Sequence, residues 1–176
     1  MSCFYEIQSI NDPLYHQFEK IYVLSFPVFE QRNREQQQLA FKSELYHLCC
    51  IVEDNILNSF VAYWEFPEYI YIEHLAVNND LKGRNIGTTT LQLLKKEVNK
   101  IIILEIDPIV DDISAKRLHF YEKLDFRINP YQHFHPSYNN NYPPHELVVL
   151  STEKILDQEL YFQFKSDLES VIMKFE

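Results

Sequence analysis

Glycine is almost absent from this sequence, because its 176 residues contain only two glycines and both lie in Lys82–Gly87, the hexapeptide KGRNIG. Glycine lets main-chain N–H groups converge, and at the start of a helix such groups bind anions such as phosphate. The alternating stretch Tyr69–Val77 precedes this loop, and the stripe Leu91, Leu94 and Val98 follows it. Alternation predicts a strand and the stripe predicts a helix. The sequence therefore predicts an anion-binding loop between a strand and a helix.

Basic residues are also scarce, since 16 lysines and arginines stand against 26 acidic residues and the net charge is −10. A protein that binds nucleic acids or anionic membranes in general needs a basic face. The composition therefore argues against both kinds of partner, and it suits a cationic or amine substrate.

Cysteines and long apolar runs are few as well. Cys3, Cys49 and Cys50 form neither a disulfide framework nor a zinc-binding spacing, so we expect free thiols in a reducing compartment. The N-terminal stretch MSCFYEIQSIND has no basic or apolar signal region, and no apolar run is long enough to span a bilayer. These absences predict a cytoplasmic protein without a membrane partner.

The rest of the composition is that of a folded domain, with 46% hydrophobic and 15% aromatic residues. No internal repeat or linker divides the chain, so we expect one domain over residues 1–176. Residues 151–176 are expected to form a C-terminal amphipathic helix that packs on the sheet or against a second subunit, as in a homodimer. Its apolar stripe consists of Leu156, Leu160, Phe164, Leu168, Ile172 and Phe175.

Periodicity and turn residues predict the other elements. Asp12 and Pro13 start a helix that Pro27 ends, and Asp54-Asn55 forms a tight hairpin turn. Strands are expected at residues 3–10, 46–53, 56–66, 69–77, 101–106, 126–130 and 146–150. Further helices are expected within 29–44, after the glycine loop, and at 111–124. Helices flanking a mostly antiparallel, mixed sheet give the expected fold class, α/β (α+β).

This order of elements, together with two sequence blocks, resembles the GNAT superfamily of N-acyltransferases. The family's acetyl-CoA loop has the form Arg/Gln-x-x-Gly-x-Gly/Ala, on which Lys82–Gly87 lies, and a later helix ends in a signature that Phe120–Phe126, FYEKLDF, matches. The segments SFPVFEQR, YIEHLAV and LEIDP are similar to one bacterial branch of that superfamily. The resemblance covers the chain up to about residue 151 and implies a GNAT-like fold.

Three residues depart from the family pattern. Lys82 replaces the commoner arginine or glutamine, and Asn85 and Asp125 stand where glycine is usual. Asn and Asp tolerate left-handed backbone angles better than other non-glycine residues. We therefore expect both turns to form, while the substitutions leave the tightness of cofactor binding open.

The resemblance implies that acetyl-CoA is the acyl-donor cosubstrate. Main-chain N–H groups from Gly83 to Thr88 would bind its pyrophosphate, with added charge from Lys82 or Arg84, and the preceding strand would bind its pantetheine arm. A nearby amide would polarise the thioester carbonyl, which contributes about 3 kcal/mol to lowering the barrier. The implied cofactor-binding residues are Leu75, Ala76, Val77, Lys82, Gly83, Arg84, Asn85, Ile86, Gly87, Thr88 and Ser114.

Acylation of an ammonium substrate requires a base, and Glu73 is the leading candidate because desolvation in a cleft would raise its pKa towards neutrality. Glu105, on the next expected strand, is the rival. His74 is expected on the opposite face of the strand from Glu73, which makes it a weaker candidate. The family places a tyrosine at the position of Tyr121, near the thioester sulfur. Tyr121 is therefore the candidate general acid for the departing thiolate.

His133 and His135 would lie on one side of an extended segment, as half of a metal site would, but no further ligand has suggestive spacing. We therefore expect no metal and interpret the segment as part of a loop that lines the acceptor pocket. The candidates for the acceptor site are Phe29, Glu30, Tyr131, His135 and Tyr138.

The sequence thus predicts transfer of an acetyl group from acetyl-CoA to a primary amine by direct attack, with acid and base assistance. A catalytically inactive acyl-CoA-binding or regulatory protein is the alternative, which Asn85 and Asp125 would allow. A structural dimer built on the C-terminal helix would leave the clustered glycines unexplained. The acceptor stays open between a small metabolite, a peptide N-terminus, a lysine side chain and an aminoglycoside, because acceptor specificity lies in variable loops.

Overall fold

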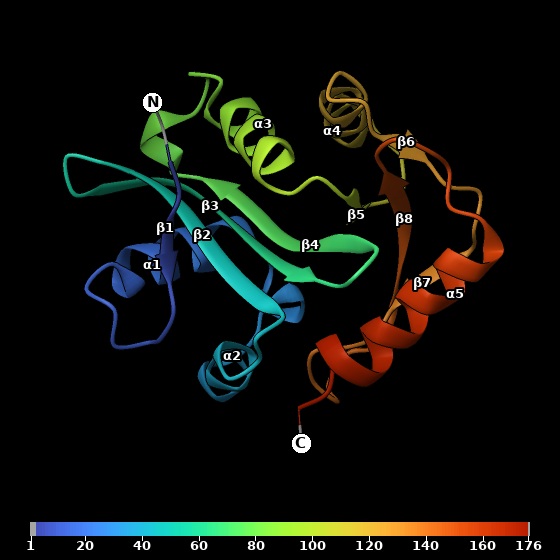
Figure 1. Cartoon of the computed structure of the whole chain (residues 1–176), viewed down its shortest axis with the longest axis horizontal. Coiled ribbons are helices and arrows are strands. Elements are labelled where there is room, and N and C mark those ends of the chain that lie inside the picture. The colour runs from blue at the N-terminus through green and yellow to red at the C-terminus, as the bar shows by residue number, and fades with distance from the viewer. Residues whose placement is uncertain (1–2, 176) are drawn as a thin grey trace. The chain divides into compact units, whose positions relative to one another are not determined.

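The structure is a computed structural model that describes residues 3–175. The chain divides into two compact units, Met1–Lys100 and Ile101–Glu176, each with its own strands and helices (Figure 1). The predicted α/β architecture, in which helices flank the sheet, is confirmed. None of the helices within residues 3–175 is long and apolar enough to cross a membrane.

The first unit is built on four antiparallel strands in the order β1-β2-β3-β4. Helices α1 and α2 lie on one face of these strands and α3 lies on the other (Figure 1). The strands are β1 (Tyr5–Ile7), β2 (Tyr46–Glu53), β3 (Ile56–Glu65) and β4 (Tyr69–Val77), and the helices are α1 (Tyr15–Ser25), α2 (Arg34–Phe41) and α3 (Ile86–Glu97).

Two adjacent residues of β3 contact helices on opposite faces of the sheet. The ring of Phe60 packs edge-on against Phe18 of α1, with ring centroids 4.7 Å apart. The hydroxyl of Ser59 lies 2.7 Å from the hydroxyl of Thr90 in α3. Because consecutive residues of a strand point to opposite faces, these two contacts define an α1/α2 face and an α3 face of the sheet.

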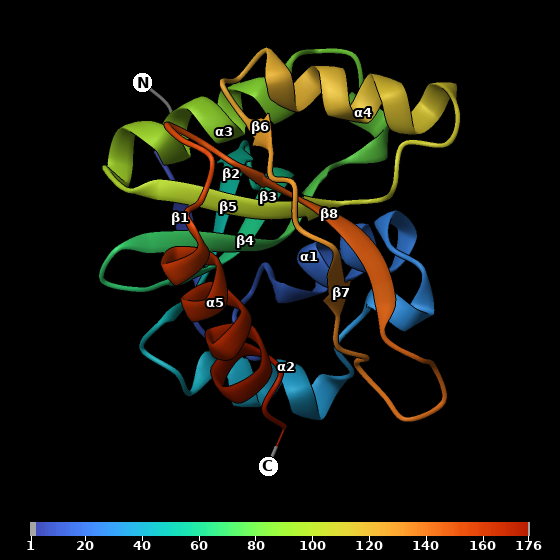
Figure 2. The same cartoon turned by 90° about the vertical axis from the view of Figure 1, so that its right-hand side faces the viewer.

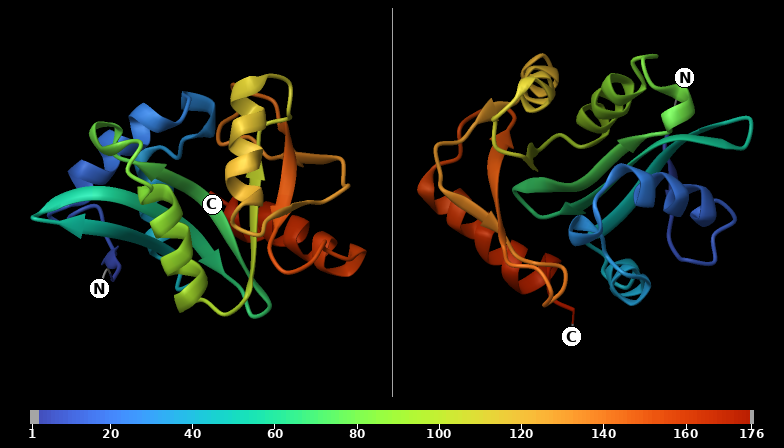
Figure 3. Two further views of the ribbon diagram at one scale, coloured as in Figure 1. Left: turned by 90° about the horizontal axis from the view of Figure 1, so that it is seen from above. Right: turned by 180° about the vertical axis from the view of Figure 1, so that it is seen from behind.

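The predicted hairpin turn between β2 and β3 is confirmed. Asp54 and Asn55 adopt left-handed backbone angles, with φ of 51° and 62°. Two positive φ angles in a two-residue loop match the right-handed twist of the paired strands, and both views of Figure 3 show β2 and β3 as one long hairpin.

The ladder between β3 and β4 contains a bulge at Glu73. Ala62 pairs with His74, and the next residue of β3, Tyr63, pairs with Ile72, so Glu73 is an extra residue without a partner in β3. A bulge of this kind interrupts the alternation of side chains between the faces of a sheet. Residues on either side of it therefore do not follow one continuous alternating pattern.

The second unit is built around β8, with which β5, β6 and β7 all pair antiparallel (Figure 2). The short strand β7 falls inside the segment that the sequence predicts as a loop. The strands are β5 (Ile101–Ile106), β6 (Arg127–Ile128), β7 (His133–His135) and β8 (His145–Ser151), and the helices are α4 (Asp112–Glu122) and α5 (Gln158–Asp167).

The C-terminal helix begins later than predicted. Ser151 completes β8, and α5 starts only at Gln158, where the Asp157 carboxylate accepts a hydrogen bond from the Leu160 N–H at 2.9 Å. A π-helical turn, Leu168–Ile172, follows α5. The predicted apolar stripe is buried at Leu156, Leu160, Phe164, Leu168 and Ile172.

Candidate functional site

The loop after β4 presents the start of a helix without a side-chain cap. Gly83 has a φ of 82° and Asn85, the N-cap residue of α3, has a φ of 57°. No side chain caps the first turn of α3, and that turn contains no acidic residue. Its main-chain N–H groups and the positive end of the helix dipole therefore suit an anion.

Both basic side chains of this loop, Lys82 and Arg84, are exposed. Within residues 3–175, neither of them forms an ion pair. A Cβ atom added to Gly83 would meet no atom within 4 Å, so the backbone angle, and not crowding, favours glycine there. The helix start itself is fixed, because the Thr90 hydroxyl donates to the Ile86 carbonyl at 2.7 Å and also contacts β3 through Ser59.

Asn85 can therefore be tested as a glycine substitute. Asn85→Gly is expected to keep the left-handed turn and to leave acetyl-CoA affinity equal or a few-fold higher. Asn85→Ile should cost about 1–2 kcal/mol of backbone strain, because a β-branched residue tolerates this angle poorly. Calorimetric titration with acetyl-CoA measures both variants, and equal affinity of the isoleucine and glycine variants would contradict the expectation.

Beyond the bulge, β4 leads to this loop through Leu75 and Val77, which are half-buried, while His74 and Ala76 between and before them are buried. The main chain of Asn78 ends the strand by donating to the Asn58 carbonyl at 2.8 Å. Near the end of β4, the face that carries Leu75 and Val77 is therefore more exposed than the face that carries His74 and Ala76.

The Glu73 side chain is held in a buried ion pair. Nε and Nη2 of Arg32 donate to its two carboxylate oxygens at 2.8 Å and 3.3 Å, and the indole N–H of Trp64 donates to Oε2 at 2.7 Å. The side chains of Arg32 and Glu73 are 2% and 0% exposed. The carboxylate is thus fully engaged with donors of the protein.

This environment makes the prediction of a raised Glu73 pKa wrong. Burial alone would raise the pKa, but the charge of Arg32, with contributions from His74 and Trp64, outweighs burial and holds it at about 2. A carboxylate with so low a pKa is a weak proton acceptor at neutral pH. Glu73 is therefore poorly suited to the role of general base.

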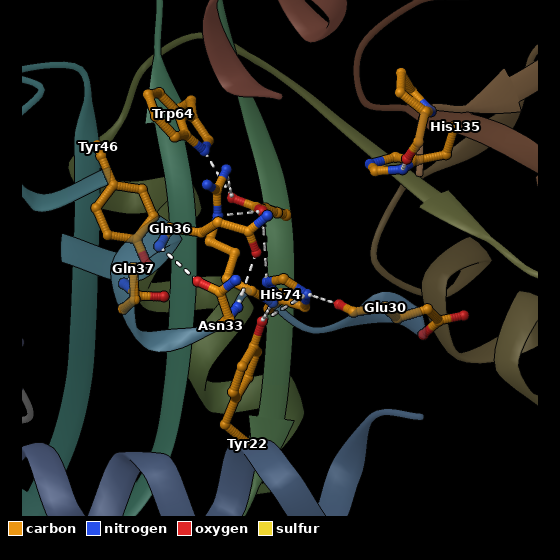
Figure 4. A network of polar contacts seen from close by, with 12 residues as sticks. Tyr22, Glu30, Asn33, Gln36, Gln37, Tyr46, Trp64, His74 and His135 are labelled. Carbon is orange, nitrogen blue, oxygen red and sulfur yellow. Dashed lines mark hydrogen bonds and ion pairs between the residues drawn. The ribbon is translucent and has the colours of Figure 1, made fainter. Parts of the chain in front are cut away.

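The position of His74 also differs from the prediction. His74 Nδ1 lies 3.9 Å from Glu73 Oε1, so the two side chains share the α1/α2 face. Figure 4 shows His74 between Tyr22 and Glu30, and its Nε2 donates to the Glu30 carbonyl at 2.8 Å. The rings of Tyr22 and Phe26 pack edge-on against it. The bulge explains this outcome, because strict alternation would have separated Glu73 from His74.

The Glu73 carboxylate is expected to make the protein sensitive to acid. Its pKa drops from the ordinary value of 4.5 to about 2 on folding, so the charged form favours the folded state. This stabilisation is complete above about pH 5 and is lost as the pH falls towards 2, a change of about 3 kcal/mol. Urea unfolding at a series of pH values should show that Glu73→Gln flattens this dependence. The control Glu65→Gln, which changes a half-exposed carboxylate, should not; an equal slope in wild type and Glu73→Gln would contradict the expectation.

In the second unit, Glu105 forms the centre of a chain of titratable side chains. His133 Nε2 lies 2.5 Å from Glu105 Oε2, and His133 Nδ1 lies 3.0 Å from the Tyr161 hydroxyl. A carboxylate can only accept, so Nε2 carries the proton, and in the neutral imidazole Nδ1 accepts from Tyr161. The His133 and Glu105 side chains are 0% and 4% exposed.

Two further imidazoles lie near this carboxylate. His135 Nε2 is 3.9 Å from Glu105 Oε1, and its Nδ1 donates to the Pro136 carbonyl at 2.7 Å. Burial and the nearby His135 lower the pKa of His145. Within residues 3–175, no group of three or more potential ligands is arranged to hold a metal ion.

Tyr121 lies on α4 and is half-buried, with its ring edge-on to Phe126 at 5.5 Å. Burial raises its pKa to about 12, and the charge of Arg117 offsets part of this effect. The phenol therefore stays protonated across the neutral range. Asp125, the next-to-last residue of the block Phe120–Phe126, has a φ of 68°, so the predicted left-handed turn is confirmed without glycine.

A family model described as the acetyltransferase (GNAT) family matches residues 12–126, which is more than half of the chain. The chain belongs to this family. It is thus a GNAT acyltransferase, as the two sequence blocks predict.

Relatives of known structure or sequence agree with this assignment. The chain is 27% identical over 153 residues to YjbC of Bacillus subtilis (strain 168), provisionally named an acetyltransferase; the match covers 85% of this chain and 71% of YjbC. A GNAT-family structure from Bacteroides thetaiotaomicron, also provisionally named, has a TM-score of 0.88 at 24% identity and covers 97% of this chain and 98% of its own. A GNAT acetyltransferase from Elizabethkingia anophelis, solved with acetyl-CoA bound, has a TM-score of 0.59 at 15% identity and covers 87% and 98%.

Two of the candidate site residues, Ser114 and Tyr131, have structural contacts of their own. The Ser114 hydroxyl belongs to the capping box of α4, where it bonds Asp111 Oδ1 at 2.7 Å. The Tyr131 hydroxyl donates to the Leu156 carbonyl at 2.7 Å, and the Tyr131 ring stacks on Tyr161. These contacts account for both side chains without a ligand.

The other acceptor candidates divide by exposure. His135 and Tyr138 are buried and stack on each other, with ring centroids 5.3 Å apart. Phe29, in the 3₁₀ turn Val28–Glu30, is 37% exposed, and Glu30 is half-buried.

Sequence reasoning missed four residues of these networks: Arg32, Trp64, His133 as a partner of Glu105, and Tyr161. The partners lie far apart in the chain, and only Arg32 carried a signal, as the charged end of the family-like segment SFPVFEQR.

Proposed function

We propose that this GNAT protein transfers an acetyl group from acetyl-CoA to a primary amine. The amine nitrogen attacks the thioester carbonyl directly, the carbon–sulfur bond breaks, and coenzyme A leaves as a thiolate that takes up a proton. The uncapped, glycine-containing start of α3 directly after a bulged strand is the observation that carries the proposal. Such a helix terminus suits the pyrophosphate of coenzyme A.

The exposed main chain at the bulge is the proposed donor to the thioester oxygen. The Glu73 side chain is completely buried, yet the residue as a whole is half-buried, so its exposed part is main chain. An amide aimed at the developing oxyanion typically contributes about 3 kcal/mol. Gly83–Thr88 would hold the pyrophosphate, with Lys82 and Arg84 adding charge.

Glu105 is the proposed general base in place of Glu73. The bond from His133 fixes the orientation of its carboxylate, and the Glu105 side chain is 4% exposed. Glu105 would take up a proton from the substrate ammonium. The hydrogen-bonded chain from Glu105 through His133 to Tyr161 would help to accommodate the resulting change in charge. Phe29 and Glu30 stay the proposed acceptor contacts, because Phe29 is exposed and Glu30 half-buried, whereas His135 and Tyr138 are buried and the Tyr131 hydroxyl bonds Leu156.

Tyr121 is the proposed donor to the departing thiolate. A phenol with a pKa of about 12 is always protonated at neutral pH, but it is a weaker acid than a thiol, so it acts mainly as a hydrogen-bond donor. Tyr121→Phe is expected to lower kcat about tenfold or more, with acetyl-CoA affinity nearly unchanged. Steady-state kinetics and calorimetry measure the two effects, with Phe120→Leu as the control on the same helix. Unchanged turnover in Tyr121→Phe would remove the assignment.

An inactive acyl-CoA-binding protein is the second candidate, favoured by Asn85 and Asp125 in place of glycine. Calorimetry with acetyl-CoA followed by thiol release with pooled amines separates the two functions. Binding with amine-dependent thiol release supports the transferase, and binding without release supports the second candidate. A cytoplasmic location is part of the proposal, supported by three free cysteines.

A further inference from the structure

The bulge in β4 brings two adjacent side chains, Glu73 and His74, to the same face of the sheet. In a regular strand, the adjacent residues Glu73 and His74 would point to opposite faces of the sheet. The bulge lets both side chains lie on the α1/α2 face, where Arg32 and Trp64 bond the Glu73 carboxylate at 2.7–3.3 Å and His74 donates to the Glu30 carbonyl at 2.8 Å. A buried carboxylate without such partners is strongly unfavourable. The Arg32–Glu73 ion pair and the bond from His74 to Glu30 together therefore favour the bulged register.

The same network fixes the segment between α1 and α2. The main-chain N–H of Arg32 donates to the Tyr22 hydroxyl at 2.8 Å, and His74 holds the Glu30 carbonyl (Figure 4). The Arg32 guanidinium also lies over the Trp64 ring, 5.5 Å from its centroid. The segment 26–33 thus contacts both Glu73 and His74, through the Arg32 side chain and the Glu30 main chain respectively.

We propose that Arg32 and Glu73 are positioning residues for acetyl transfer: their buried ion pair locks the β4 bulge in the geometry that exposes its main chain and anchors residues 26–33 beside it. The proposal rests on the proposed function, because the bulge amide is the donor to the thioester oxygen. Glu73 then acts through the backbone and takes up no proton, which fits a carboxylate whose oxygens are already bonded to Arg32 and Trp64.

Several charged and titratable groups surround the Glu73 carboxylate. They include Arg32 from the α1–α2 segment, His74 from β4, and the phenols of Tyr22 and Tyr46, whose pKa values are themselves raised by burial. Arg32 is the permanent cation among them. Changes at Arg32 or Glu73 should therefore affect both the bulge and residues 26–33 together.

Hydrogen–deuterium exchange in the ligand-free protein tests the structural half of the proposal. Glu73→Gln and the charge-conserving Arg32→Lys are compared with Tyr46→Phe, which removes the nearby buried bond from Gln37 at 2.9 Å but no bond to the bulge. Both test variants should speed exchange in peptides covering 26–33 and 70–77 about tenfold, and the control should not. If Glu73→Gln fails to fold, Arg32→Lys carries the test.

Kinetics test the catalytic half. A misplacement of about 1 Å can cost about 100-fold in rate, so Glu73→Gln should lower kcat by up to that factor, with the KM for acetyl-CoA within threefold and the shape of the pH–rate profile unchanged. The double variant should be no worse than the more impaired single variant. A rate that becomes proportional to hydroxide in Glu73→Gln would make Glu73 the base and overturn the proposal.

The outcomes distinguish failure of the positioning role of Arg32 and Glu73 from failure of the proposed acetyl transfer. If the wild type releases thiol but both folded variants show unchanged exchange, only the positioning role is overturned. If the wild type neither binds nor consumes acetyl-CoA, the proposed function falls, and with it the role in acetyl transfer.

Discussion

Arg32→Met should lower the free energy of unfolding by about 3–5 kcal/mol, because it leaves the Glu73 carboxylate buried without its cation. The ion pair is nearly inaccessible to water, with side chains 2% and 0% exposed. Replacing both partners with apolar residues, as in Arg32→Met/Glu73→Leu, should restore most of the loss, since no buried charge remains. Urea unfolding at neutral pH measures all three proteins.

The chain offers a matched control for this experiment in Lys100. Lys100 Nζ bonds Glu65 at 2.8 Å, the same distance as in the buried pair, but the two side chains are 29% and 36% exposed. Exposed pairs of this kind contribute at most about 1 kcal/mol, so Lys100→Met should cost little. Equal losses in Arg32→Met and Lys100→Met would show that burial does not decide the strength of the Arg32–Glu73 pair.

The largest effect on activity is expected from Glu105→Gln, which should lower kcat about 100- to 10,000-fold, the usual contribution of a general base. The amide keeps an oxygen that can accept from His133, so the fold should be preserved. The acidic limb of the pH–rate profile should also disappear. Stopped assays of thiol release with a saturating amine acceptor measure the rate.

Glu146→Gln, an exposed carboxylate on β8, is the control in the same unit. It should retain wild-type activity. Two results together would assign the general base to Glu73. Folded Glu105→Gln would keep wild-type turnover, and Glu73→Gln would lose most of its activity and show a rate proportional to hydroxide.

Local signals made most of the fold predictable. Asp54-Asn55 and the KGRNIG loop combine turn residues with flanking periodicity, and such signals depend only on neighbours in the chain. The start of α5 was predicted at Ser151, which is wrong because Ser151 belongs to β8, a strand whose partners lie far away in the sequence. Helix boundaries that depend on such pairing carry little local signal.

The candidate site was less predictable, because a single extra residue changes which face a side chain occupies. Glu73 and His74 alternate in the sequence but share a face in the structure, and the donors that lower the Glu73 pKa come from Trp64 and from Arg32, which lies 41 positions away. Likewise, His133 meets Glu105 across 28 positions. Neither the bulge nor these long-range pairings leaves a periodic pattern in the sequence. The sequence could therefore identify Glu73 and Glu105 as candidate carboxylates, but it could not assign their roles.

Titration of the intact protein with acetyl-CoA, followed in the same sample by thiol release on addition of pooled primary amines, tests the central claim most directly. Acetyl transfer predicts saturable heat of binding and thiol release that requires both acetyl-CoA and an amine. Absence of amine-dependent thiol release, with or without binding of acetyl-CoA, would contradict it.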